Sequence, residues 1–314
     1  MFSPQTEWTP PDELKDLSQA KQIAIDLETR DPNLTTRGSG SVRDDGEIVG
    51  IAVAVEGWSG YFPIAHEGGG NIDKKIVLNW FKDVLQTPAT KIFHNAMYDV
   101  SWIRALGFKI EGRIVDTMIA GSLVNENRLR YNLNSLAREY VGMDKNEKIL
   151  FEAAKEWGVN PKKEMWRLPA MHVGEYAEQD AVATLKLWER LQQEITAQDL
   201  WDIFNVETEL FPCLVDMKFK GVRVDLEKAH KIKKDLIKEE KQFLQKVKKE
   251  TNLEVEIWAA ASIAKVFDKL KLPYDRTATG APSFTKNFLS QHPNETAQAI
   301  AQAREINKAH TTFI

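Results

Sequence analysis

The sequence is poor in several features that would restrict its function, beginning with cysteine. Cys213 is the single cysteine among 314 residues, so the chain can form neither an internal disulfide nor a thiolate-ligated metal site. No apolar run approaches the roughly 18 residues of a membrane span, and the first residues lack the basic and apolar regions of a secretory signal. We therefore expect an untargeted cytoplasmic chain without a membrane partner.

The chain also lacks an excess of basic residues, since its net charge is −4. That value would argue against a nucleic-acid partner if the charge were evenly spread. Acidic residues are in excess by seven before residue 201, whereas Lys and Arg are in excess by three from there on. A cation-binding front half joined to a rear half that meets phosphates is compatible with this division, and ordinary surface polarity explains it equally well.

Hydrophobic periodicity predicts an α/β front half and a mainly helical rear half. The ranges with strand character are residues 21–28, 48–55, 59–64 and 91–93. The ranges with helical spacing are residues 73–85, 95–106, 116–140 (as two short helices), 172–194, 200–219 and a long stripe from Asp225 to Val247. The polar residues 29–47 predict a loop, and residues 145–170 predict an irregular, mobile connection.

Three short segments carry groups suited to catalysis. Asp26 and Glu28 alternate along a predicted strand, so both carboxylates project from one face and favour a hard cation. A solvated strand edge explains this pair at least as well. Asn95 and Asp99 lie one helical turn apart just after a strand, where a helix cap and an exposed acid are the alternative.

The third segment repeats that spacing on the helix predicted over residues 172–194. Tyr176 and Asp180 lie one turn apart, although Tyr176 could equally be a core aromatic. In this order the three segments resemble the three motifs of DnaQ-like four-acid exonucleases. A tyrosine four residues before the last aspartate is typical of the tyrosine subclass, because the histidine subclass has His at the position of Glu175.

Over nearly the whole chain the sequence resembles the proofreading 3′–5′ exonuclease domain and the start of the polymerase module of a bacterial or phage DNA polymerase I-family (family A) enzyme. The resemblance implies a ribonuclease H-like mixed sheet flanked by helices, followed by a mainly helical C-terminal region. The implied domains are residues 1–198, the exonuclease, and residues 199–314, the part leading to the polymerase thumb.

The same resemblance implies two divalent metal ions, Mg²⁺ or Mn²⁺, roughly 3.5–4 Å apart across the scissile phosphate. Asp26, Glu28 and Asp180 would ligate the first ion, Asp26 would bridge to the second, and Asp99 would hold the second through waters. Tyr176 would orient the attacking water. A phenol with a pKa near 10 is a poor base at neutral pH, so we expect positioning rather than proton removal.

Substrate contacts follow from the resemblance as well. Thr29 and Asn95 are expected to contact the terminal nucleotide, and Leu34 is a candidate wedge against the terminal base. His94 departs from the commonest polymerase I pattern and resembles ribonuclease D-like relatives. In this chain it is expected either to contact a phosphate or to cap the helix. The expected substrates are single-stranded 3′ ends of DNA, including frayed primer termini.

The rear half contains residues that resemble the approach to the thumb, such as those of segments 277–283 and 304–313. The catalytic polymerase motifs of the palm and fingers are absent from the sequence, so we expect no primer extension by this chain alone. The expected partner is the remaining polymerase portion, in cis or as a separate chain. A basic helix face, spanning residues 233–249, either tracks duplex DNA or is a solvated surface.

Two other functions are also compatible with the sequence. A ribonuclease D-like RNA-trimming enzyme shares the four acids, but it would carry a different helical domain in place of the thumb-like segment. A non-catalytic scaffold for a polymerase partner would be expected to have lost acids, whereas all four are retained.

Overall fold

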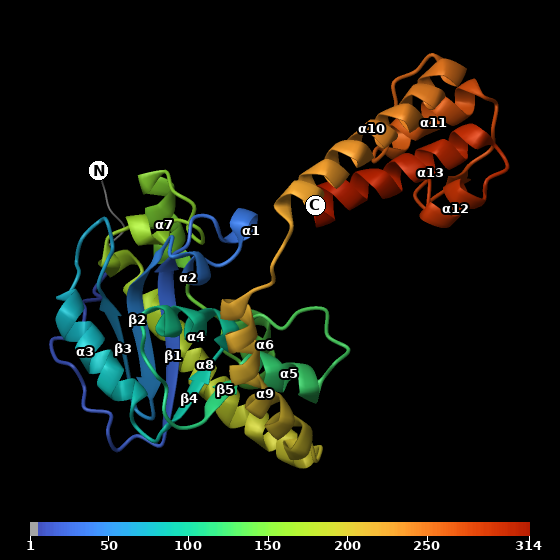
Figure 1. Ribbon diagram of the computed structural model, residues 1–314. Helices are drawn as coiled ribbons and strands as arrows, with labels where there is room; N and C mark the ends of the chain where they lie inside the picture. The colour runs from blue at the N-terminus through green and yellow to red at the C-terminus, as the bar shows by residue number, and fades with distance from the viewer. Residues whose placement is uncertain (1–5) are drawn as a thin grey trace. The chain divides into compact units, whose positions relative to one another are not determined.

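The computed structural model describes residues 6–314, which form two compact units that divide between Gly221 and Val222 (Figure 1). The first unit contains a mixed five-stranded sheet flanked by helices, and the second is mainly helical. This confirms the predicted fold class. Helix α9 (Trp201–Lys220) belongs to the first unit because Phe204, Phe211 and Val215 are buried in its cores. The predicted division into functional modules at residues 198 and 199 stays a prediction.

The sheet has the strand order β3-β2-β1-β4-β5. β1 pairs antiparallel with β2, and β2 with β3, whereas β1 runs parallel to β4 and β4 to β5. The strands are β1 (Gln22–Arg30), β2 (Glu47–Val55), β3 (Trp58–Pro63), β4 (Thr90–Phe93) and β5 (Ile114–Asp116). Four of them agree with the predicted strands, and β5 escaped prediction because three residues show no periodicity.

Alternation along β1 divides the core into two layers. Ile23, Ile25 and Leu27 face α3 (Lys74–Leu85) and α4 (Ala96–Ala105). Ala24 lies on the opposite face, together with small residues of β2, under α5 (Thr117–Val124), α6 (Leu133–Val141) and α8 (Gly174–Ala197). Because these side chains are small, α8 can lie close to the sheet, and Figure 1 shows it crossing behind the strands.

Two predicted loops contain helices. Residues 29–47 include the end of β1 and the one-turn helices α1 (Leu34–Arg37) and α2 (Gly40–Arg43). The connection over residues 145–170 contains α7 (Lys148–Trp157), so the prediction of an irregular segment is wrong. The buried residues Leu150, Ala153 and Ala154 have helical spacing and pack against Met165, Leu168 and Val173. Charged neighbours obscure this narrow apolar stripe in the sequence.

The second unit has a core of its own. Asp225 caps its first helix, as predicted, by accepting a hydrogen bond from the backbone N–H of Lys228 at 2.9 Å. Phe267 and Ile300 are fully buried in the core. The helices are α10 (Leu226–Thr251), α11 (Ala260–Lys269), α12 (Lys286–Gln291) and α13 (Glu295–Lys308). Over residues 6–314, no helix combines the length and apolar character that crossing a bilayer requires.

Candidate active site

The centre of the candidate site is the face of β1 that α8 covers. Asp26 and Glu28 project from this face, and their cross-strand partners in β2 are Ala52 and Gly50. These small partners leave space above the carboxylates. A side chain at Gly50, the cross-strand partner of Glu28, would overlap the ring of Tyr61. The pairing of β1 with β2 has a register irregularity between Glu28 and Thr29, and such an irregularity bends a strand locally.

Helix α8 supplies the third carboxylate. Asp180 is buried, and its oxygen lies with those of Asp26 and Glu28 in a group whose atoms are all within 4.8 Å of one another. The helix can approach because Ala177, Ala181 and Ala183 face the sheet. Two acids of β1 therefore converge with one from a helix that lies far away in the sequence.

Asp99 lies beside this group without being part of it. β1 pairs with β4 only over Gln22–Ala24, so the N–H of Leu27 finds no partner on β4. Asp99, in the first turn of α4, accepts that hydrogen bond through Oδ1 at 3.0 Å. The carboxylate is buried and is fixed where the two strands separate. Burial, followed by the charge of Asp26, raises the pKa of Asp99.

Burial and mutual repulsion make these acids reluctant to ionise. Burial, followed by the charge of Asp180, raises the pKa of Asp26 to about 7. Burial and the neighbouring carboxylates hold the pKa of Glu28 well above its usual range. Burial also raises the pKa of Asp180, although the ammonium of Lys145 opposes the shift. Such a group binds a cation readily, because a cation offsets the repulsion.

The donor set fits a divalent metal ion. Mg²⁺ and Mn²⁺ prefer carboxylate oxygens, and three are available in one small volume. The buried Oδ1 of Asp180 forms an ion pair with the ammonium of Lys145, so this position already holds a positive charge.

Tyr176 lies one turn before Asp180 on α8. Its hydroxyl accepts a hydrogen bond from Nζ of Lys162 at 3.3 Å, and that ammonium lies 4.3 Å from the centroid of its ring. Burial, followed by the charge of Asp180, holds the pKa of Tyr176 well above its usual range. The phenol therefore stays protonated at neutral pH and is available as a hydrogen-bond donor.

Sequence reasoning missed Lys145 and Lys162. Both belong to the connection between α6 and α8 that was predicted to be irregular, and both reach toward the acids. Lys162 also pairs with Glu147 at 2.5 Å. Lysines in polar segments are ordinarily solvated, so their spacing carries no signal. Only the path of the connection across α8 reveals them.

The predicted substrate contacts divide into two groups. Thr29 and Leu34 line a cavity of about 230 Å³ together with Glu28 and Tyr98. Thr29 Oγ1 and the hydroxyl of Tyr98 lie 2.6 Å apart, which fixes the threonine side chain at the cavity wall. Leu34 begins α1 and is 40% exposed, so an apolar side chain stands at the edge of this cavity.

Asn95 and His94 do not line that cavity. Asn95 adopts a left-handed conformation, with φ of 65°, and its side chain makes no capping hydrogen bond to α4. Asp116 instead ties down the turn by accepting the backbone N–H groups of Asn95, at 3.0 Å, and Ala96, at 2.8 Å. His94 Nδ1 lies 2.9 Å from Thr117 Oγ1, and burial lowers its pKa to about 4, so the ring is neutral.

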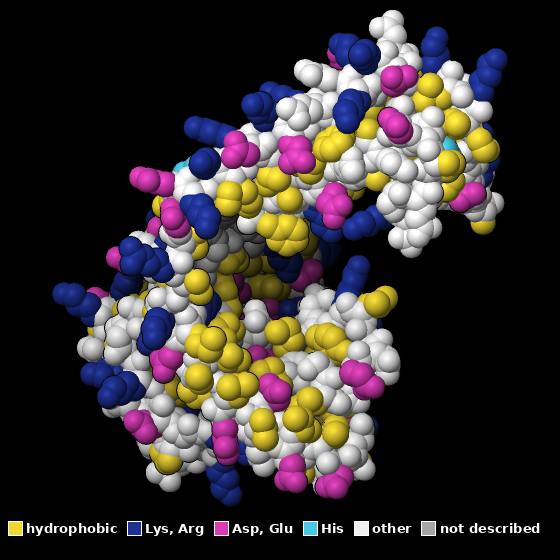
Figure 2. Space-filling view, turned by 45° about the vertical axis from the view of Figure 1, so that its right-hand side comes forward, with side chains coloured by type: hydrophobic (Ala, Val, Ile, Leu, Met, Phe, Trp, Pro, Cys, Tyr) yellow, Lys and Arg dark blue, Asp and Glu magenta, His cyan; other side chains and the backbone are white. Residues whose placement is uncertain are grey.

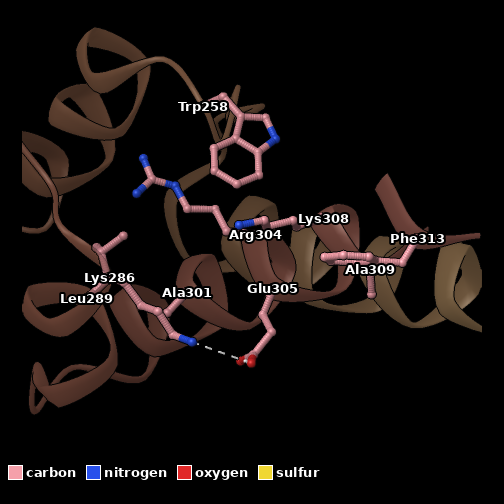
Figure 3. Close-up of a pocket in the computed structure, with 9 residues that line it drawn as sticks. All are labelled: Trp258, Lys286, Leu289, Ala301, Arg304, Glu305, Lys308, Ala309 and Phe313. Carbon is pink, nitrogen blue, oxygen red and sulfur yellow. Dashed lines mark ion pairs between the residues drawn. The ribbon is translucent and has the colours of Figure 1, made fainter. Parts of the chain in front are cut away.

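The second unit contains a larger cavity, of about 500 Å³, with different chemistry (Figure 3). Arg304 lies over the ring of Trp258, 5.4 Å from its centroid. Glu305 is the one carboxylate among the lining residues, and it pairs with Lys286 at 3.6 Å. Basic and aromatic groups suit an anionic ligand with flat rings, whereas hydrolysis through a hard cation requires several acids.

Comparison with known proteins places these features in a family. The family model of the DNA polymerase A 3′-5′ exonuclease matches residues 2–196. A DNA-directed DNA polymerase of Pseudomonas phage M6 is 33% identical over 98% of this chain and 48% of its own length. DNA polymerase I of Pseudomonas aeruginosa is 27% identical over 96% of this chain and 33% of its own length. The chain thus spans less than half of the length of each of these two relatives.

A solved structure resembles the chain as well. The POL domain of Pol1 from M. smegmatis, in complex with DNA primer-template and dNTP, has a TM-score of 0.63 at 15% sequence identity. The match covers 94% of this chain and 46% of that chain. At this identity the likeness concerns the fold.

Proposed function

The chain belongs to the DNA polymerase A 3′-5′ exonuclease family, and on this premise we propose that it removes nucleotides from DNA 3′ ends by metal-dependent hydrolysis. The observation that supports this most directly is the convergence of Asp26, Glu28 and Asp180 within 4.8 Å. Repelling carboxylates at low exposure serve little structural purpose, whereas a cation held between them gives the site a chemical use.

We assign two ions, Mg²⁺ or Mn²⁺, to this site. Asp26, Glu28 and Asp180 would hold the first, and Asp26 and Asp99 would serve the second. Bound ions of this kind lower the pKa of a water and offset negative charge on the leaving oxygen. The fixed hydrogen bond from Leu27 to Asp99 keeps the fourth carboxylate from closing onto the other three, which leaves room for a phosphate group.

Tyr176 would position the attacking water. Its raised pKa rules out a phenolate base at neutral pH, and its hydroxyl stands beside Asp180 on the same helical face. A protonated phenol can donate one hydrogen bond and accept another, so it can fix the orientation of a water without removing its proton.

The terminal nucleotide would enter the cavity next to Glu28. Thr29 offers a hydroxyl at its wall, and Leu34 offers an apolar surface for a base. Asn95 is exposed and follows the end of β4. It would contact the same nucleotide on the side of the site where Asp99 lies. His94 is held by Thr117 and is neutral, so we assign it to supporting the turn rather than to binding phosphate by charge.

The second unit would act on the nucleic acid as part of a longer polymerase. The relatives extend well beyond the portion that this chain spans, so we take the remaining polymerase portion as its partner. In Figure 2, Lys and Arg side chains of the second unit alternate with Asp and Glu on the face shown. Within residues 233–249, Asp235, Glu239 and Glu240 interrupt the lysines, which favours a solvated face over a continuous track for duplex DNA. We place the activity in the cytoplasm.

The distinguishing experiment is digestion of 5′-labelled single-stranded DNA and RNA of the same sequence, with Mg²⁺ or with EDTA. We expect stepwise shortening of DNA from its 3′ end that EDTA abolishes. Preferential shortening of RNA would instead support a ribonuclease D-like function. If neither strand is shortened under any metal condition, the chain is a scaffold and the proposal is wrong.

A further inference from the structure

Lys145 occupies an unusual place for a lysine. Its side chain is 8% exposed, and its ammonium forms an ion pair with Asp180, whose side chain is 7% exposed. The ammonium also lies 5.2 Å from the centroid of the Tyr176 ring. A lysine is rarely buried this deeply unless a carboxylate compensates for the loss of water. The burial therefore indicates a built contact rather than a surface pair.

The contact involves an oxygen that a metal ion would need. The ammonium of Lys145 lies directly against Asp180 Oδ1, so it occupies a position from which that oxygen would bind a metal ion. The carboxylates of Asp26 and Glu28 lie in the same small group. The positive charge of Lys145 also favours the ionised forms of all three acids. An ammonium and a divalent cation thus compete for one negative site.

The backbone around Lys145 is anchored independently of this ion pair. The neighbouring Asn146 donates its backbone N–H to Oε1 of Gln179 on α8 at 2.9 Å. Its side-chain amide lies 3.4 Å from Oε1 of Glu175 on the same helix. The lysine side chain has a flexible four-carbon stem. The ammonium can therefore leave Asp180 while the backbone of this segment stays bound to α8.

We propose that Lys145 is the resident counter-cation of the metal-free site and is exchanged for a divalent ion when the site is loaded. This inference rests on the proposed metal site of the exonuclease. In the metal-free protein the ammonium holds the carboxylates together. On loading, the Lys145–Asp180 ion pair breaks and the ammonium moves away from the incoming charge. The exchange lowers the affinity for metal but preserves the shape of the site between reaction cycles.

Titration calorimetry with Mn²⁺ on the full chain at pH 8.0 tests the exchange. Lys145→Met removes the competitor, so Mn²⁺ should bind about tenfold more tightly than to the wild type. The metal-free variant should melt at a lower temperature, and saturating Mn²⁺ should raise its melting temperature by more than that of the wild type. Lys145→Arg, which keeps the charge, should bind Mn²⁺ no more tightly than the wild type.

Lys148→Met is the matched control, since Lys148 has an exposed side chain that pairs at 4.0 Å with Glu152, one turn further along α7. Its Mn²⁺ affinity should equal that of the wild type. If Lys145→Met is too unstable to titrate, Lys145→Gln carries the same expectation. Unchanged or weaker Mn²⁺ binding by the Met and Gln variants, with binding by the wild type intact, overturns the exchange alone. Absence of Mn²⁺ binding by the wild type overturns the proposed metal site as well.

Discussion

Asp26 is the residue on which the chemistry of the site depends most. It is grouped with Glu28 and Asp180, and its charge adds to burial in raising the pKa of Glu28 and of Asp99. Replacing Asp26 with Ala should reduce exonuclease activity by about 1000-fold or more, because a shared metal ligand is lost. The free energy of unfolding of the metal-free protein should stay level or rise, because repulsion is relieved.

Activity assays with labelled DNA and denaturant titrations without metal measure these two effects. Near-wild-type activity of Asp26→Ala would remove this residue from the site. A large loss of stability without metal would mean that Asp26 has a structural role that its raised pKa does not suggest.

Tyr176 is expected to act through its hydroxyl group. Tyr176→Phe should slow cleavage by about 10–1000-fold, because a water-orienting hydrogen bond is lost while the ring remains. Mn²⁺ affinity, measured by calorimetry, should remain within about twofold of the wild type, because the three carboxylates are unchanged. A collapse of Mn²⁺ affinity would show that Tyr176 supports the ligands instead.

His66 gives the protein a pH dependence that is separate from the acids. Its Nδ1 donates to the carbonyl of Leu168 at 3.0 Å, so Nε2 accepts the hydroxyl of Tyr61 at 2.7 Å. Burial lowers the pKa of His66 to about 4. Because the unfolded state takes up a proton first, stability should fall as the pH drops from about 6.5 to about 4, by about 3 kcal/mol at most.

The measurement is the free energy of unfolding at pH 7 and at pH 4.5. His66→Gln keeps a donor and an acceptor but does not titrate, so the loss between these pH values should be smaller in the variant. An equal loss in both proteins would assign the acid sensitivity to other groups.

At the scale of elements, helix α9 packs into the first unit, although the predicted module boundary lies just before it. Phe204 stacks on Trp188 of α8 at 5.3 Å, and Phe211 and Val215 enter the core beneath α4. A fragment of residues 1–221 should therefore unfold cooperatively and retain metal-dependent digestion of DNA. A fragment of residues 1–198, which follows the predicted module boundary, should be destabilised by several kcal/mol, because it uncovers aromatic core surface.

Thermal denaturation and digestion assays on the two fragments provide the comparison. Equal melting temperatures would mean that α9 adds nothing to the first unit, and the boundary at residues 198 and 199 would then also describe the folding unit.

Elements with strong periodicity were predictable and short or charged ones were not. β1 and α8 carry uninterrupted alternation or helical spacing, so the faces that bear Asp26, Glu28 and Asp180 could be deduced. α7 was missed because its buried stripe of Leu150, Ala153 and Ala154 is narrow. The position of Lys145 depends on how the connection crosses α8, which is a tertiary contact that local sequence does not encode.

At the scale of the whole molecule, the first unit brings acids of β1 and α8 together on one face of a sheet, and the second unit presents basic and aromatic groups around a cavity of its own. The three acids suit the binding of a hard cation, and the basic and aromatic groups suit an anionic ligand. The chain spans 48% of the length of its relative from Pseudomonas phage M6.

The most direct test of this account is anomalous diffraction from crystals of the wild-type protein soaked in Mn²⁺. The account predicts a strong anomalous peak bounded by the carboxylates of Asp26, Glu28 and Asp180, with Lys145 withdrawn from Asp180. Crystals that hold Mn²⁺ elsewhere, or that leave Lys145 paired with Asp180 and show no peak among the three acids, would contradict it.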